Sequence, residues 1–301
     1  MAAGGVMQDW RLKWAFPWLS RWPWPSAWQF ASVLGREPAA QRRHVQYWLA
    51  EKFAGIFPNQ PEQLYTHWAQ MHLNMLAQEM LDAMAFHRLG VAGGPSIALT
   101  GLEHVREVQA QGRGFILVLN HFDRLLTAPV ALAGQGIVTN VLTMPVLENL
   151  ELGDAQRRFL LQKIQGYTSV TKGIWHTTSK GMRPVVDSLR AGQGWVVLAD
   201  AWRPEFGKLR HHHFLGGQLS LPTGIERLAN SCGAPLLHAA TYTESPTRMR
   251  VVLEPLPTNP VHAIDAVVAN LERDVRERPW AWWQWGQWDQ MWTPPKQEGV
   301  L

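Results

Sequence analysis

The stretch GRGFILVLNHFDRLL, residues 112–126, decides the fold of this chain. Residues 115–119 form an unbroken apolar run, which is typical of a strand buried on both faces of a parallel sheet. The run leads through Asn120 into His121, and a carboxylate, Asp123, follows two positions later. Because ligands of open parallel sheets bind beyond the carboxyl ends of the strands, the stretch predicts a central strand that presents a histidine to a ligand site.

On both sides of this strand, short apolar segments alternate with amphipathic ones. This alternation predicts an α/β fold with a mostly parallel central sheet flanked by helices. The predicted strands are 96–101, 114–120, 137–145, 194–200, 234–243 and 248–256. The predicted helices are 101–112, 154–165, 181–191, 221–232 and 260–279.

The composition is that of a globular protein, because 46% of the 301 residues are hydrophobic and 17% are charged. The 28 Lys and Arg residues exceed the 24 Asp and Glu residues by only four, which does not indicate nucleic-acid binding. The single cysteine, Cys232, excludes an intramolecular disulfide and a cysteine-based zinc site. No apolar run reaches about 18 residues, the minimum for a membrane-spanning helix, and charges and prolines interrupt the N-terminus too often for a signal peptide.

Most of the 17 tryptophans gather near the two ends of the chain. Tryptophan favours the boundary between hydrocarbon and water, and the first cluster also contains Arg11, Lys13 and Arg21. This combination predicts contact with an anionic membrane surface, with packing against the domain as the alternative. For the second cluster, residues 279–292, we expect packing.

Residues 26–90 carry apolar positions at helical spacing, with a break at Pro58, and therefore predict a helical N-terminal region. Their methionine-rich face is typical of a core, although it also suits a channel for an acyl chain. We expect a helical, membrane-surface region over 1–90 and an α/β domain over 91–301, packed as one compact unit.

Two predicted strands end on ionisable residues, His121 and Asp200, which places both at the same edge of the sheet if the strands are neighbours. A histidine in this position can act as a general base near neutral pH, with a carboxylate that fixes its tautomer. The alternative is a structural histidine. No GxGxxG or GxxxxGK[ST] motif follows a strand, and no GxSxG motif is present, so nucleotide binding and a serine nucleophile are unsupported.

Three consecutive histidines, 211–213, lie close to Arg203, Lys208 and Arg210. Adjacent residues of an extended chain point to opposite faces, so this run does not predict a metal site. We interpret the segment as a polar loop that either contacts an anionic ligand, such as a phosphate, or is solvated.

In this order, four segments resemble the bacterial lipid A biosynthesis acyltransferases, a branch of the lysophospholipid acyltransferase superfamily. GRGFILVLNHF is similar to the family's strand and catalytic histidine, and LRAGQGWVVLADAW occupies the place of a segment that ends in Asp-Gln. FLGGQLSLPTGIERLANSCGAPLL resembles its phenylalanine-glycine loop and the following helix, and LERDVRERPWAWWQWGQW resembles its closing helix and Trp-rich tail.

The resemblance implies transfer of a fatty-acyl group from acyl carrier protein or acyl-CoA to a hydroxyl of a lipid-like acceptor. His121 would act as general base without an acyl-enzyme, and the thioester substrate would serve without a further cofactor or metal. The implied location is peripheral, at the cytoplasmic face of the bacterial inner membrane. The acceptor is lipid A by family default, with a polyketide or polyene lipid as the alternative. The expected substrate contacts are Asn120, Arg124, Arg203, Lys208, Arg210, Phe214 and Gly216.

The chain departs from the family's His-x4-Asp/Glu pattern, because Leu126 occupies the position of the acid. Either Asp123 or Asp200 would replace it, and Asp200 becomes the better partner if Arg124 neutralises Asp123. Three interpretations remain at this point: an active acyltransferase with a relocated carboxylate, a slow enzyme without an acid, or a degenerate acyltransferase fold that binds a carrier protein or partner. Hydrolysis, with water as acceptor, is a further alternative.

Overall fold

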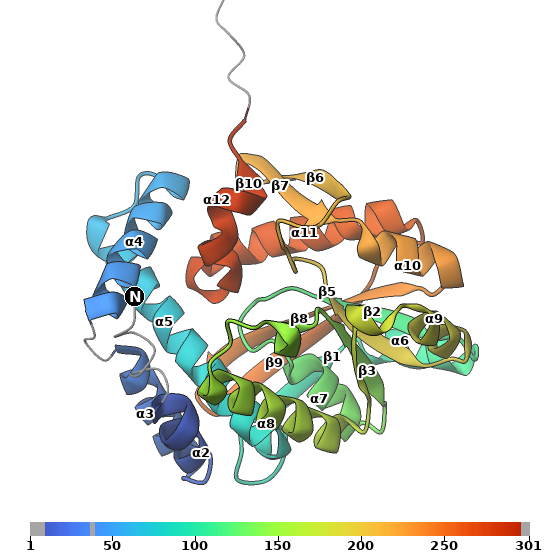
Figure 1. Ribbon diagram of the computed structural model, residues 1–301, viewed down its shortest axis with the longest axis horizontal. Coiled ribbons are helices and arrows are strands. Elements are labelled where there is room, and N and C mark those ends of the chain that lie inside the picture. Colours follow the sequence, from blue (N-terminus) through green and yellow to red (C-terminus); the bar gives the residue numbers. More distant parts are fainter. Residues whose placement is uncertain (1–9, 37–39, 296–301) are drawn as a thin grey trace, which may run out of the picture.

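The computed structural model describes residues 10–36 and 40–295 and confirms a mixed α/β fold built on a mostly parallel sheet (Figure 1). The sheet has seven strands in the order β1-β9-β8-β2-β5-β3-β4, and only the β8–β9 pair is antiparallel. Its strands are β1 (Ser96–Thr100), β2 (Phe115–Leu119), β3 (Thr139–Thr143), β4 (Trp175–Thr177), β5 (Gly194–Leu198), β8 (Leu236–Ser245) and β9 (Arg248–Pro255).

Strand β2 lies in the middle of the sheet, and all of its residues are buried, as its apolar run predicts. It pairs in parallel with β5, with Leu119 opposite Leu198. The amide of Ala199 also donates to the carbonyl of Leu119 at 2.8 Å. Since the two strands end side by side, the residues that follow them meet at one edge of the sheet.

Two hydrophobic clusters cover the two faces of the sheet. One face carries the helices α5, α7 and α8, and the other carries α9, α10 and α11 together with the C-terminal tail (Figure 1). The helices of the α/β part are α6 (Leu102–Ala110), α7 (Thr127–Gly134), α8 (Asp154–Thr171), α9 (Arg183–Arg190), α10 (Gly224–Cys232), α11 (Pro260–Glu277) and α12 (Trp288–Met291). Short 3₁₀ turns are η2 (Phe86–Arg88), η3 (Val146–Glu148), η4 (Thr178–Lys180), η5 (Pro279–Ala281) and η6 (Trp283–Gln287).

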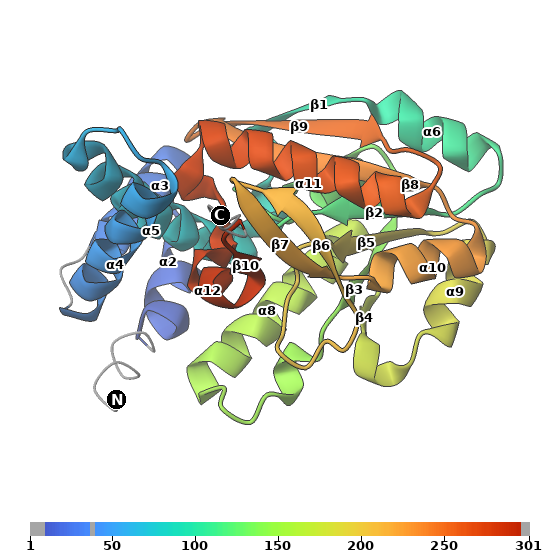
Figure 2. The ribbon, with the colours of Figure 1, turned by 90° about the horizontal axis from the view of Figure 1, so that it is seen from above.

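The N-terminal region is helical and rich in tryptophan, as expected, and it gathers beside one end of the sheet (Figures 1 and 2). Its long helix α5 packs against α3, α4 and α8. The elements are the π-helix η1 (Arg11–Ala15), α2 (Phe16–Leu19), α3 (Trp24–Arg36), α4 (Ala40–Ile56) and α5 (Glu62–Ala85). No helix in the described ranges is long and apolar enough to cross a membrane. Residues 1–9 and 296–301 of the two predicted regions lie outside the described residues.

The two tryptophan clusters differ in burial. Trp282, Trp285 and Trp288 are buried and pack edge to face or tilted against one another, which confirms the predicted packing of the C-terminal cluster. In the N-terminal cluster Trp24 and Trp28 are buried, whereas the side chains of η1 and α2 that face outward are exposed, among them Trp14 at 73% and Trp18 at 56%. The N-terminal cluster therefore has a packed side and a free side.

The prediction of a polar loop at His211–His213 is wrong, because this segment forms a strand. Strands β6 (Leu209–Phe214) and β7 (Gly217–Pro222) make a hairpin, which β10 (Trp292–Thr293) extends to a three-stranded sheet. Leu215 and Gly216 both have positive φ, at 49° and 78°, and form its two-residue turn. Alternation buries His212 and Phe214 against the core, which is why a run of histidines occurs in a strand.

Candidate active site

His121 and Asp200 meet directly at the carboxyl ends of β2 and β5. The imidazole Nδ1 lies 2.9 Å from Oδ1 of Asp200, and the backbone N–H of His121 donates to the same carboxylate at 2.9 and 3.0 Å. The indole Nε1 of Trp282 donates to Oδ2 of Asp200 at 2.8 Å. The carboxylate of Asp200 is completely buried, so these N–H groups replace the water that would otherwise stabilise its charge.

These contacts determine the tautomer of the histidine. A carboxylate only accepts hydrogen bonds, so the Nδ1 atom that faces Asp200 carries the proton. The Nε2 atom on the opposite edge of the ring then keeps a free lone pair. The side-chain amide nitrogen of Gln284 also lies 2.9 Å from Nδ1, but a protonated Nδ1 cannot accept from it, and the amide donates instead to the backbone carbonyl of Asp200 at 3.1 Å. His121 is therefore held in the form that a general base requires.

A large cavity of about 940 Å³ opens beside this pair. His121 and Gln284 line it, together with side chains that follow β3 and β5 and side chains of α8, α9 and α10. The lining is mostly aliphatic and aromatic, and its charged residues are Lys163, Lys208 and Arg227. A volume near the upper end of the usual range for ligand sites, about 300–1,000 Å³, suits a long apolar ligand.

Asp123 turns away from His121. Its φ of 48° lies in the left-handed region, which aspartate tolerates better than most residues, and its carboxylate accepts from N and Oγ1 of Thr243, both at 2.7 Å. Burial raises the pKa of the Asp123 carboxyl, while the bonds from Thr243 act in the opposite direction. Asp123 thus anchors the loop after β2 to β8, and Asp200 provides the carboxylate at the histidine.

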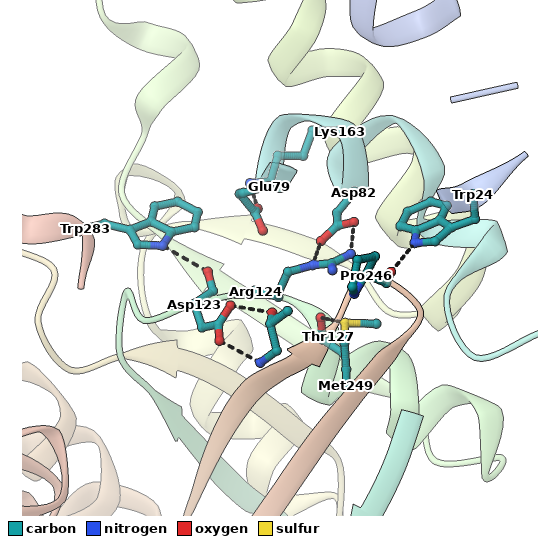
Figure 3. Close-up of polar contacts among 11 residues, drawn as sticks. Trp24, Glu79, Asp82, Asp123, Arg124, Thr127, Lys163, Pro246, Met249 and Trp283 are labelled. Carbon is teal, nitrogen blue, oxygen red and sulfur yellow. Dashed lines mark hydrogen bonds and ion pairs between the residues drawn. The ribbon is translucent and has the colours of Figure 1, made fainter. Parts of the chain in front are cut away.

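Arg124 pairs with Asp82 of α5 instead of neutralising Asp123. The ion pair is bidentate, through Nε and Nη2, and both side chains are buried (Figure 3). The guanidinium lies 4.2 Å from the ring centroid of Trp28 and 5.8 Å from that of Trp24. Arg124, predicted as a substrate contact, therefore connects the loop that follows His121 to the helices α3 and α5.

A second ion pair lies nearer the cavity. Lys163 of α8, which lines the cavity, donates to Glu79 of α5 at 3.0 Å (Figure 3). Its ammonium also lies 5.9 Å from the ring centroid of Trp283, another lining residue. The charge of Lys163 is thus matched by a carboxylate where it meets the apolar lining.

The other predicted substrate contacts are distributed differently. Lys208 lines the cavity, and so does Leu126, at the position of the absent acid. Arg210 is engaged by Glu226 and Asp265, with nitrogen-to-oxygen distances of 2.7 and 2.6 Å. Of the five predicted contacts other than Arg124 and Asn120, Lys208 is the one that the structure brings to the cavity.

Four further predicted contacts are not among the residues that line the cavity. Phe214 is fully buried against Trp282 and Trp288. Gly216 belongs to the hairpin turn between β6 and β7. Asn120 is buried, with its amide nitrogen 3.4 Å from Nε2 of His238. Arg203 lies in the loop between β5 and β6 and does not appear among the cavity residues of the described chain.

Sequence reasoning did not identify Trp282, Gln284 or Lys163 as parts of the site. The first two lie in the Trp-rich tail, about 80 residues after Asp200 in the sequence (positions 282 and 284 against 200), and no local pattern distinguishes them from packing residues. Within the described residues, no group of three or more His, Cys, Asp or Glu side chains is arranged to hold a metal ion.

Comparison with known proteins matches the chain to one family. A family model described as bacterial lipid A biosynthesis acyltransferase matches residues 22–287. The matched range includes His121, Asp200 and Gln284, and it covers both the N-terminal helices from Trp22 onward and the whole parallel sheet. A search of curated proteins found no significant match.

Proposed function

Because the chain belongs to the bacterial lipid A biosynthesis acyltransferase family, we propose that it transfers a fatty-acyl group from a thioester donor to a hydroxyl of a lipid-like acceptor. The observation that carries this proposal is the His121–Asp200 pair beside an apolar cavity of about 940 Å³. A base with a free Nε2 suits removal of a hydroxyl proton. The apolar lining suits an acyl chain, whose burial contributes about 0.8 kcal/mol per CH₂ group.

The reaction proceeds by direct attack. Nε2 of His121 accepts the proton of the acceptor hydroxyl, and the oxygen attacks the thioester carbonyl carbon. The C–S bond then breaks, and the leaving thiolate takes the proton from the imidazolium. An ester and a free thiol result, so no acyl-enzyme and no cofactor besides the thioester donor are needed. During the reaction the Asp200 carboxylate stabilises the imidazolium and keeps the ring oriented.

In this proposal Asp200 performs the function of the acid that the family pattern places at position 126. Leu126 is buried and lines the cavity, so this position contributes apolar surface to the substrate. The chemistry is retained because a carboxylate reaches Nδ1 from the neighbouring strand.

The donor in this proposal is an acyl carrier protein or acyl-CoA. Both carry the thioester on a phosphopantetheine arm, whose phosphate suits a cationic site. Lys208 and Arg227 are exposed and line the cavity, which supports a phosphate-bearing donor. The acceptor is a lipid A precursor by family, and a hydroxyl on a polyketide or polyene lipid is the second acceptor to test.

We further propose that the free side of the N-terminal cluster rests on the cytoplasmic surface of the inner membrane. Trp14, Trp18 and Phe30 are exposed on η1, α2 and α3, and Lys13 and Arg21 are exposed next to them. Aromatic rings prefer the interface, and cations are attracted to anionic headgroups. The double variant Trp14→Ser/Trp18→Ser should lose binding to anionic vesicles, whereas Val138→Ser, which removes an exposed apolar side chain outside this cluster, should not.

The experiment that tests the function is a mass-spectrometric transfer assay with acyl carrier protein loaded with chains of several lengths. Wild type should form the acyl ester of a hydroxyl lipid, and His121→Ala should form none. Free fatty acid in place of ester would identify a hydrolase. Equal loss of thioester in wild type and His121→Ala would refute catalysis and leave a binding protein with this fold.

A further inference from the structure

The cavity wraps around the carboxyl edge of the sheet and reaches both of its faces. Successive side chains of a strand point to opposite faces. Val196 of β5 belongs to the hydrophobic cluster under α8, and Val197 packs into the cluster under α9 and α10. In β3, Val141 and Leu142 divide between the two clusters in the same way. All four side chains line the same cavity.

The lining of the cavity therefore falls into two sets of side chains, one on each face of the sheet, which we call the two arms of the cavity. The α8 arm lies on the face that carries α5, α7 and α8, and the α10 arm lies on the face that carries α9 and α10. The α8 arm is lined by Leu126, Val141, Leu160, Ile164, Trp175 and Val196. The α10 arm is lined by Leu142, Met182, Val186, Val197, Ile225 and Leu228. The side chains named here for each arm are all apolar.

His121 and Asp200 lie at the carboxyl edge of the sheet, between the two faces that carry the arms. His121 follows β2, next to β5, and its carboxylate partner Asp200 follows β5 itself. Trp283, on the α8 side, and Gln284, beside the imidazole, line the cavity with it. An acyl transfer brings two substrates to one base, and a single extended chain needs only one of two arms.

We propose that the two arms hold two different hydrocarbon chains, the donor acyl chain in the α10 arm and the chain of the acceptor in the α8 arm. The inference rests on the proposed function and deepens it, because it makes the acceptor a lipid whose hydroxyl is close to its own hydrocarbon chain. A polar acceptor with a distant hydroxyl would leave the α8 arm empty.

Charge distinguishes the arms. Lys208 and Arg227 are exposed and line the α10 arm, and neither takes part in an ion pair with another described residue. They suit the phosphate of the donor arm. On the α8 side, Lys163 is already neutralised by Glu79. A phosphate therefore gains more at the mouth of the α10 arm.

The neighbours of α8 support the same assignment. Helix α8 packs against η1, whose outward side carries the exposed Trp14. The exposed Leu161 lies on α8 itself, and Leu150, at 95% exposed, precedes it. An acceptor lipid in a membrane surface against these side chains would lie beside α8, whose Leu160 and Ile164 line the α8 arm.

The first test counts chains without catalysis. Isothermal titration with dodecanoate, below its micelle concentration, should give two bound chains per wild-type protein. Leu160→Trp and Val186→Trp each place an indole in one arm at a half-buried helix position and should each reduce the number to one. Leu161→Trp, on the same helix but outside the lining, should keep two. One chain in wild type would overturn the proposal.

The second test assigns the arms. Val186→Trp should raise KM for the acyl donor by about tenfold or more, since a change of one methylene group in an apolar pocket already has an effect of this size, and should leave KM for the acceptor unchanged. Leu160→Trp should do the reverse. Both variants acting on the same substrate would overturn the assignment. A wild type that transfers nothing would refute the proposed function. The number of dodecanoate chains bound in the first test would still show whether the two arms each hold a chain.

Discussion

Replacement of Asp200 by asparagine most directly tests the proposal that Asp200 performs the function of the acid absent at position 126. The carboxylate of Asp200 accepts the backbone N–H and Nδ1–H of His121 and the indole N–H of Trp282. An amide has one oxygen and one NH₂ group, so it leaves one of these donors without an acceptor or turns the imidazole to the tautomer with the proton on Nε2. Neither form leaves a base at Nε2 with a carboxylate behind it.

The expected loss follows from the equivalent change in serine proteases, where the same substitution lowers kcat by about 10⁴. At about 1.36 kcal/mol for each factor of ten, this corresponds to about 5.4 kcal/mol of transition-state stabilisation. We therefore expect Asp200→Asn to reduce single-turnover acyl transfer by about three to four orders of magnitude, while thermal unfolding verifies that the protein still folds.

Asp123→Asn is the matched control, because Asp123 is the other carboxylate next to the histidine. Its carboxylate oxygens accept hydrogen bonds from Thr243. Loss of this carboxylate should therefore lower the free energy of unfolding by about 1–3 kcal/mol and reduce the transfer rate far less than Asp200→Asn does. A rate for Asp200→Asn within tenfold of wild type, or a larger loss for Asp123→Asn, would refute the assignment of Asp200.

Three further outcomes are expected. Arg124→Met should destabilise the protein by about 3–5 kcal/mol, because Asp82 becomes a buried unpaired charge, and adding Asp82→Leu should recover much of this in denaturant unfolding. Burial lowers the pKa of His72 to about 4. As the pH falls, the unfolded state therefore binds a proton at this histidine before the folded state does, and the free energy of unfolding should fall by up to about 3 kcal/mol between pH 6.5 and 4. His72→Asn should flatten this fall. Trp282→Phe should lower kcat about tenfold by removing a donor from Asp200.

The sequence was sufficient to predict the elements whose pattern is local. The apolar run at 115–119 predicted the central strand, and the ends of two strands predicted that His121 and Asp200 share one edge of the sheet. The alternation of strands and helices predicted the fold class, because this pattern repeats within windows of about ten residues.

Features that depend on distant partners were not predictable in this way. The partner of Asp123 is Thr243, 120 positions away, and that of Arg124 is Asp82, 42 positions away. Helix α7 is buried almost throughout and has no polar face to reveal its period. The hairpin β6–β7 turns at Leu215 and Gly216 without the Asn-Gly or Asp-Gly pair that usually marks such a turn.

The tail that follows α11 determines when the site can form during synthesis of the chain on the ribosome. The amide of Trp283 donates to the carbonyl of His121 at 2.9 Å, and Trp282 and Gln284 bond to Asp200. A nascent chain that has emerged only through β9 already contains His121 and Asp200 but lacks the tail residues that bond to them. We therefore expect His121 and Asp200 to be held in this arrangement only after residues 282–284 have also been synthesised.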